Sequence, residues 1–315
     1  MRAQRGVALM MSLALLVLIS VAALDWSATA RPRRLEVAAI IDRAELDAVA
    51  TGGIEAARAQ LSQLLRVGPM RSVRDPTRVL DAWSAADGTA FHSDAAGELQ
   101  YRVEMHDAGA RLNLNAATED QFRKLLLAFR LDARRADRLA QALADWRDGD
   151  RLRRTNGAER DDYLRADRAV LPDDGPFESV SVLRFVMGMT DSLYVLLRSH
   201  VTVLGSGRIN LNAAERPVLL TLPGMTEETV ALLLRYRGQG RRVTDLNRFA
   251  DELSPSGRSL LRSALPMLQA AAVLDTREIH VASDAWRRGS NVRVRIDGIV
   301  SRDDEGRVTW RRVGP

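Results

Sequence analysis

The 315-residue sequence contains no cysteine, and Lys124 is the one lysine among its 46 basic residues. The absence of cysteine excludes disulfide bonds, thiolate metal sites and cysteine catalysis. It leaves the cellular compartment open, because exported proteins with large cores do not need disulfides. Aromatic residues make up only 5% of the chain, but 46% of the residues are hydrophobic. This content and length predict a folded protein with about two or three compact units.

The sequence also lacks the usual signatures of an enzyme. No nucleophile elbow and no glycine-rich phosphate loop is present. The four histidines do not have the spacing of metal ligands: His92, His106, His200 and His280. The net charge of +5 comes from acidic and basic residues interspersed along the chain, which favours a solvated mixed surface over a nucleic-acid-binding one. We therefore expect a protein that is not an enzyme.

The first 24 residues combine a short basic leader with a long apolar run. The leader, MRAQRG, ends at Gly6, and the next eighteen residues, Val7 to Leu24, carry no charge. At about 1.5 Å per residue, a helix of this length just spans the hydrocarbon core of a bilayer. Ala28-Thr29-Ala30 also fits the small-residue pattern of a signal-peptide cleavage site, so a secreted mature chain is the alternative. Arginines flank the run on both sides, so their distribution does not decide its orientation.

Residues 35–65 have the periodicity of a long amphipathic helix. Apolar residues recur at spacings of three and four, and they form one stripe: Ile41, Ala44, Ala48, Ile54, Ala57, Leu61 and Leu64. We expect the stripe to cover a sheet and, through Ile41, Ala44 and Ala48, to dock against partner helices as well.

Strand patterns occur in two places that are far apart in the sequence. Residues 99–105 alternate between apolar and polar side chains, and residues 292–313 alternate around a turn at 304–306, which is typical of an antiparallel hairpin. The intervening residues 112–270 have a helical pattern. We therefore predict an α+β fold in which a long N-terminal helix packs on a small antiparallel sheet, with a large all-helical insertion.

The insertion contains an internal repeat. RLNLNAA at 111–117 and RINLNAA at 208–214 are nearly the same, and each precedes two predicted helices. Asn115 and Asn212 are expected to cap the first helix of each copy. LPGMTEETVALLLRYR at 222–237 resembles a helix-hairpin-helix, which binds nucleic-acid phosphates and also occurs in competence-type DNA receptors. Glu227 and Glu228 would repel a phosphate, which favours a packing or protein-docking module.

One stretch, DWRDGDRLRRTNGAERDDYL at 145–164, is rich in oxygen ligands. Hard cations such as Ca²⁺ bind six to eight oxygens, but the spacing is not that of an EF-hand. The arginines in the same stretch compete for these carboxylates. A salt-bridged surface loop and a calcium site both remain open from the spacing alone.

Taken together, the leader that ends at Gly6, the strand patterns and the helical insertion resemble the K-type minor pseudopilins of bacterial type II secretion, the GspK family. The segments that carry the resemblance are DAGARLNLNAA, ADWRDGD, NGAERDDYL, ESVSVLRFVMGMT and INLNAA. The resemblance covers essentially the whole chain. It implies a pilin-like fold with helix-hairpin-helix or SAM-like repeats in the insertion.

The resemblance also implies how the N terminus is processed. Prepilin peptidase would cleave between Gly6 and Val7, and Val7 would be N-methylated. Most pilin-like proteins have glutamate at the fifth mature position, where it neutralises the terminal amine of the next subunit, but this chain has Met11. An unpaired carboxylate inside a membrane is unfavourable, so its absence suits a subunit at the tip with nothing above it. The K-type family is known for this exception.

The resemblance further implies a division of the chain, its partners and a metal. The expected segments are the leader 1–6, the membrane span 7–24, the pilin-like part 25–111, the insertion 112–270 with subdomains 112–205 and 206–270, and the closing strands 271–315. The expected partners are the I- and J-type minor pseudopilins, with the H type as a further one, and prepilin peptidase. The chain itself is expected in the bacterial inner membrane as a single-pass protein, with its C-terminal domain in the periplasm. The expected calcium ligands are Asp148, Asp150, Glu159 and Asp162.

Overall fold

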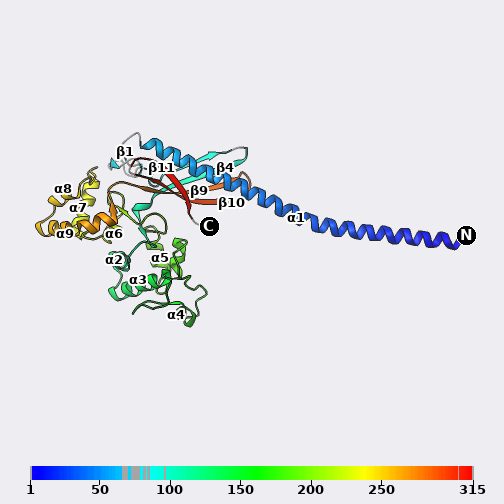
Figure 1. Cartoon of the computed structure of the whole chain (residues 1–315), viewed down its shortest axis with the longest axis horizontal. Helices are drawn as coiled ribbons and strands as arrows, with labels where there is room; N and C mark the ends of the chain where they lie inside the picture. The colour runs from blue at the N-terminus through cyan, green and yellow to red at the C-terminus, as the bar shows by residue number, and fades with distance from the viewer. Residues whose placement is uncertain are drawn as a thin grey trace.

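The computed structural model describes residues 2–65, 70–71, 79–80, 83, 86–95, 97–303 and 305–313. It describes the backbone without the side chains for residues 2–10, 12, 22–35, 70–71 and 79–80. The fold consists of a long N-terminal helix, an antiparallel sheet and a helical region (Figure 1).

Helix α1 (Arg2–Leu64) projects as a rod from the rest of the protein (Figure 1). Its C-terminal part packs on one face of a sheet with the order β11-β10-β9-β4-β3, in which all neighbours are antiparallel. The strands are β3 (Ala90–Asp94), β4 (Leu99–Asp107), β9 (Glu278–Arg287), β10 (Arg293–Arg302) and β11 (Val308–Val313). The predicted antiparallel hairpin of residues 292–313 is thus confirmed as β10 and β11. A separate two-stranded pair joins β1 (Met70–Arg71) to β2 (Val79–Leu80).

The helix and the sheet share one hydrophobic core. The residues of α1 that enter it are Leu46, Ala50, Ile54, Ala57 and Leu61, and Val103, Met105, Ile279, Val281 and Ala285 face them from the sheet. The predicted stripe is therefore correct from Ile54 onward, but its first three residues, Ile41, Ala44 and Ala48, are exposed and do not cover the sheet. Leu46 and Ala50 lie on the buried face instead, because they are at helical spacing from Ile54.

Gly53 allows this close packing. A Cβ atom at this position would lie 3.0 Å from Cδ2 of Tyr101 and 3.1 Å from Cγ2 of Val103, and it would clash with Oγ of Ser283. At Gly52, by contrast, a Cβ atom would have no neighbour within 4 Å. The glycine pair thus lets the helix approach β4 and β9 on one side only.

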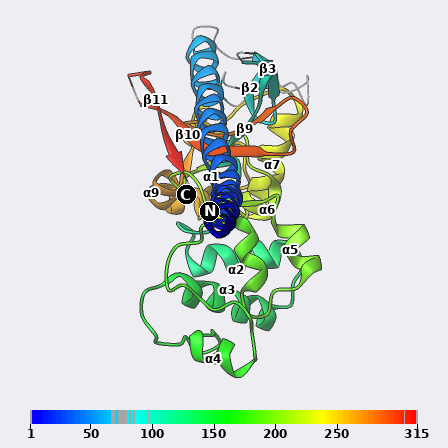
Figure 2. The same ribbon diagram turned by 90° about the vertical axis from the view of Figure 1, so that its right-hand side faces the viewer.

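The helical region is inserted between β4 and β9, after the short 3₁₀ helix η2 (Ala108–Ala110). Its first half contains β5 (Leu112–Asn113), α2 (Glu119–Ala128), α3 (Ala133–Arg147), α4 (Arg160–Arg165), η3 (Val180–Phe185), α5 (Asp191–Leu197) and β6 (Val201–Thr202). Its second half contains β7 (Ile209–Asn210), α6 (Arg216–Leu219), α7 (Glu227–Gly238), α8 (Leu246–Asp251), α9 (Pro255–Ala271) and β8 (Ala272–Val273). Figures 1 and 2 show α2 to α5 as one group, with α6 to α9 as a second group nearer the sheet.

Each half is closed by a parallel pair of two-residue strands. β5 pairs with β6 and β7 pairs with β8, so the first and last residues of each half lie side by side. The buried side chains of the two halves nevertheless form a single continuous hydrophobic cluster, distinct from the cluster under α1. The insertion therefore has its own core.

The asparagines of the repeated cassette do not cap helices. Thr118 caps α2 by accepting from the backbone N–H of Gln121, and Asn115 instead donates its Nδ2 to the carbonyl of Phe177 and accepts from the N–H of the same residue. Asn212 makes the equivalent pair of bonds to Val243. The expectation of an N-cap was wrong, because these amides bind segments far along the chain instead.

Candidate metal centre

Carboxylates gather where α3 ends and α4 begins. Asp148 is the C-cap of α3, Glu159 is the N-cap of α4, and Asp150 lies in the loop between them. One oxygen of each of these three residues lies within 4.8 Å of the other two. The structure thus brings together three of the four residues that the sequence analysis named as calcium ligands.

Several of these oxygens are buried without a partner. Asp148 Oδ1 and both carboxylate oxygens of Glu159 have no hydrogen-bond partner among the described residues. Burial, and then the negative charges of Asp145, Asp148 and Asp174, raise the pKa of Glu159 above its ordinary value. Buried polar atoms are normally satisfied in proteins, so orphaned carboxylate oxygens that repel one another fit a bound cation. Their oxygen chemistry fits Ca²⁺ in particular.

Asp174 adds a fourth carboxylate that the sequence analysis did not name. Its Oδ1 is also buried without a hydrogen bond to any described residue, and its charge acts on Glu159. Its backbone has a φ of 51°, which few non-glycine residues adopt. No spacing rule connects position 174 to the 148–159 loop, so only the fold identifies it.

Asp162 does not belong to this cluster. Its Oδ2 accepts from the backbone N–H of Glu159 at 3.0 Å, and its Oδ1 lies 2.6 Å from the guanidinium of Arg165. It also lies 3.4 Å from Arg153. Asp162 as a calcium ligand therefore stays a prediction: its carboxylate lies next to the backbone of Glu159, but it is already bound by a backbone N–H and by arginines.

Arg154 and Asp145 hold the loop in place. The Nη1 of Arg154 lies 2.6 Å from Oδ1 of Asp145 and 2.5 Å from Oδ2 of Asp148, and the backbone N–H of Arg154 also donates to the fully buried Asp145. Gly157 packs directly on the Asp145 carboxylate, where a Cβ atom would clash. The salt-bridged loop and the oxygen-rich cluster that the spacing left open therefore coexist. Arg154 binds Oδ2 of Asp148, and Oδ1 is left buried without a hydrogen-bond partner among the described residues.

The residues predicted to act in processing and assembly lie along α1. Gly6 and Val7 are helical in their backbone, but their side chains lie outside the described residues. Met11 has 70% of its surface exposed and Ile41 has 55%, and Ala44 and Ala48 are exposed as well. Ile41, Ala44 and Ala48 do not belong to the core between α1 and the sheet, so they stay available for the docking that the sequence predicts.

A search of the described part of the chain finds no helix that is both long and apolar enough to cross a membrane. The predicted span, residues 7–24, lies partly outside the residues whose side chains are described.

The segment that resembles a helix-hairpin-helix in sequence, residues 222–237, contacts other parts of the second half. Gly224 has a φ of 72°, as the turn requires, and Thr226 caps α7. Glu228 accepts from the backbone N–H and the Oγ of Ser254, at 2.8 and 3.0 Å, and Glu227 pairs with Arg216. The N terminus of α7 therefore packs against the start of α9.

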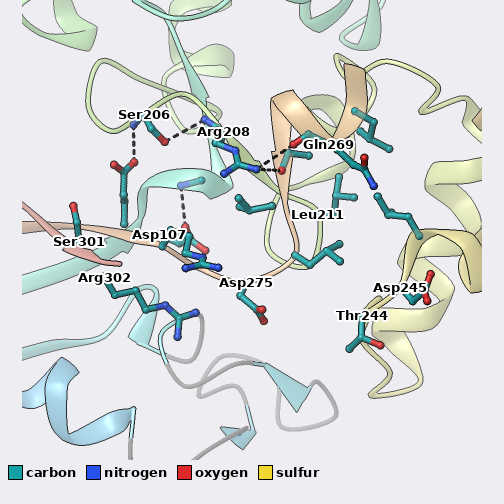
Figure 3. Close-up of a pocket in the computed structure, with 18 of the residues that line it drawn as sticks. Asp107, Ser206, Arg208, Leu211, Thr244, Asp245, Gln269, Asp275, Ser301 and Arg302 are labelled. Atoms are coloured by element: carbon teal, nitrogen blue, oxygen red, sulfur yellow. Dashed lines mark hydrogen bonds between the residues drawn. The ribbon is translucent and has the colours of Figure 1, made fainter. Parts of the chain in front are cut away.

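A cavity lies between the ends of the strands and the second half of the insertion. It has a volume of about 800 Å³, and Figure 3 shows the side chains around it. Arg208 donates to the carbonyls of Gln269 and Ala272, and Asp107 accepts from the N–H of Gly109. Ser206 of the insertion donates its backbone N–H to Glu278 of β9 at 2.6 Å, so the cavity lies where the insertion is joined to the sheet.

Comparisons with known proteins agree on one family. Residues 103–206 match the family described as "Type II secretion system (T2SS), protein K". The chain is 33% identical over 197 residues to type II secretion system protein K of Pseudomonas aeruginosa, an alignment that covers 58% of each protein. It is 30% identical over 222 residues to protein K of Klebsiella pneumoniae, with 66% of this chain and 65% of the relative covered. The alignments thus span less than two thirds of these two relatives' lengths.

A solved structure has the same fold. The crystal structure of the GspK–GspI–GspJ complex from enterotoxigenic Escherichia coli contains a chain that matches with a TM-score of 0.58 and 21% sequence identity. The match covers 90% of the present chain and 99% of that one. The expected mixture of helices with an antiparallel sheet is confirmed. The family match, the two relatives and this structure thus agree in making the chain similar to type II secretion system protein K.

Proposed function

We propose that this protein is a minor pseudopilin at the tip of the type II secretion pseudopilus, where it starts and limits pseudopilus growth for protein export. Its similarity to type II secretion system protein K is the observation that carries the proposal. A pilin-like layout, with α1 on the antiparallel sheet and the insertion between β4 and β9, supports it. The role is one of assembly rather than catalysis. The DNA-uptake alternative has no support, because the family and relatives are all protein K.

The N-terminal segment would join the protein to the inner membrane. Prepilin peptidase removes residues 1–6 and methylates Val7, and residues 7–24 enter the bilayer with the rest of the chain in the periplasm. With Met11 in place of a carboxylate, the helix buries no unpaired charge when no subunit sits above it.

The partners would be I- and J-type minor pseudopilins, together with the H type. A chain of the same fold was crystallised with GspI and GspJ, which supports the first two. Residues 37–48 of α1 offer the surface for them, because Ile41, Ala44 and Ala48 are exposed and turned away from the sheet. The bulky insertion would stop further subunits from adding at the tip.

The carboxylate cluster would hold a calcium ion. Asp148, Asp150 and Glu159 supply oxygens, and Asp174 closes the site from a second loop. The ion would neutralise carboxylates that repel one another, so it would stabilise the 148–159 loop against α3. Arg154 keeps Asp148 oriented by binding its other oxygen.

Mass spectrometry of the N terminus tests the proposal most directly. The full chain is produced with and without prepilin peptidase, and the N-terminal peptide is sequenced. We expect a start at methylated Val7 only when the peptidase is present. A chain that keeps Met1, or that starts after Ala30, would contradict the proposal. Mixing the processed chain with I- and J-type pseudopilins should then yield a ternary complex by size-exclusion chromatography.

A further inference from the structure

The α2–α3 hairpin carries four arginines that have no acidic partner among the described residues: Arg130, Arg134, Arg135 and Arg138. None of them takes part in an ion pair, although two other bases of the same hairpin do, since Arg123 pairs with Asp137 and Lys124 lies 2.6 Å from Asp120. Three of the four are exposed, and Arg135 is half-buried.

These arginines lie within nine positions of the sequence, and three of them share one side of α3. Arg134, Arg135 and Arg138 are on α3, where residues one and four positions apart fall within an arc of about 100°. Arg130 is in the turn just before the helix, with a φ of 60°. They form a positively charged surface, which we call the arginine patch.

The arginine patch is placed where positive charge is unfavourable. The first turn of α3 has no acidic residue and contains Arg134 and Arg135, next to the positive end of the helix dipole. The helices α2 and α7 have two acidic residues each in the first turn, whereas α9, like α3, has none there. Asp132, the N-cap of α3, places one negative charge at this end of the helix, but none of the four arginines makes an ion pair with a described residue. Four arginines within nine positions that bring no compensating contact within the described chain indicate a role outside it.

We infer that the arginine patch is a docking surface for a carboxylate-rich face of another protein. Guanidinium groups bind carboxylates in a bidentate manner and are common anchors in protein interfaces. Unpaired charges on one face also steer the approach of a partner of opposite charge.

The geometry favours an acidic protein over nucleic acid. A helix-hairpin-helix contacts phosphate through the free backbone N–H groups of its turn, which must be approached closely. Here the Asp132 carboxylate accepts from the N–H of Arg135 at 3.1 Å, so a negative charge already occupies that position. A ligand must therefore be bound by side chains on the flank of α3.

The position of the patch argues against a membrane surface. Helix α3 lies far from the N terminus of α1 (Figure 1). If residues 7–24 are the membrane anchor proposed above, the bilayer is at the other end of the protein. This one step rests on the proposed function, and vesicle binding tests it separately from N-terminal processing.

The test uses the full chain in a nonionic detergent with fluorescent poly-L-glutamate as the probe. Binding is measured by anisotropy for the wild type and for an Arg134→Gln/Arg138→Gln variant. We expect the Kd to rise about tenfold in the variant, because two exposed charge pairs are lost. The matched control is Arg235→Gln/Arg248→Gln, which removes the same charge from exposed positions on α7 and α8. The control should change the Kd by less than about twofold.

A charge reversal separates docking from a structural role. Arg134→Glu should weaken poly-L-glutamate binding and at the same time raise the Tm by about 1–2 °C, because it places an acid at the helix N terminus. Equal loss of binding in the control variant would overturn the inference, since the probe would then report total charge. Tighter binding of duplex DNA or of anionic phosphatidylglycerol vesicles through the same arginines would overturn it as well.

Discussion

Asn210 donates its Nδ2 to the Oδ2 of Asp107, 3.1 Å away, and so joins the second half of the helical insertion to the end of β4. Both residues are almost completely buried. The same Asp107 oxygen accepts from Oγ1 of Thr276 at 2.5 Å, just before β9, while Oδ1 accepts from the N–H of Gly109 at 2.8 Å. One carboxylate thus binds the segments by which the chain enters and leaves the insertion.

Asp107 should make the stability of the protein depend on pH. Burial raises its pKa to about 7, although Thr276, Asn210 and Gly109 donate to it. Between pH about 4 and about 7 the folded state therefore binds more protons than the unfolded state, so the free energy of unfolding should fall as pH rises through this window. The largest contribution would be about 4 kcal/mol. Asp107→Asn should remove this part of the pH dependence in urea titrations from pH 4 to 8, and an unchanged pH profile would contradict the assignment.

The internal repeat supplies a matched pair of variants that tests the hydrogen bond between Asn210 and Asp107. Asn113 occupies in the first cassette the position that Asn210 has in the second, but it donates to the carbonyls of Leu204 and Gly205 rather than to a carboxylate. Asn210→Ala and Asn113→Ala should each lower the free energy of unfolding by about 1–3 kcal/mol, because buried acceptors are left unpaired. Only Asn210→Ala should also shift the pH profile, since only it removes a donor from Asp107. The two profiles are compared by the same urea titrations.

Gly52 and Gly53 give a second matched pair, on α1. Gly53→Ala should destabilise the protein by about 1–3 kcal/mol, because the added Cβ overpacks the contact with β4 and β9. Gly52→Ala should stabilise it by about 0.5–1 kcal/mol, because that position is exposed and alanine is the better helix former. Opposite signs in thermal unfolding are expected. If both variants were stabilised, α1 would not approach the sheet as closely as described.

The elements with a clear period could be predicted from the sequence. The helix of residues 35–64, the strand from Leu99 and the β10–β11 hairpin repeat their apolar residues every 3.6 or every two positions, and local sequence decides such patterns. The central strand β9 was not singled out. Three consecutive residues, Val281, Ala282 and Ser283, are buried there, so the strand does not alternate in the usual way.

Sequence patterns did not predict the contacts between residues that are far apart in the chain. Asn115 reads as a helix cap, yet its amide binds Phe177, which is 62 positions away. Asp162 reads as one more acid in a ligand-rich stretch, yet it caps α4, while Asp174 joins the carboxylates from another loop. The role of each acidic residue therefore depends on the groups that the fold places next to its carboxylate, and the spacing in the sequence does not give these.

Removal of the Glu159 charge should have opposite effects with and without calcium. Without the ion, Glu159→Gln should raise the free energy of unfolding above that of the wild type, because it relieves the repulsion that raises the pKa of this group. For the wild type in EDTA, stability should accordingly decline as pH rises above the ordinary value of 4.5 toward the raised pKa. With calcium at about 100 times its Kd, the wild type should gain about 2.7 kcal/mol, and the variant should gain far less.

Calcium titrations of thermal unfolding measure both effects, and two further variants locate the ligands. Asp161→Asn is the matched control, because Asp161 is an exposed acid on α4 outside the cluster, and it should keep the calcium response. Asp162→Asn should lower stability equally with and without calcium, since its carboxylate caps Glu159 and pairs with arginines. Glu159→Gln should raise the Kd for calcium at least about tenfold. If Asp162→Asn lost the calcium response and Glu159→Gln kept it, the ion would be bound on the other side of α4, away from Asp148.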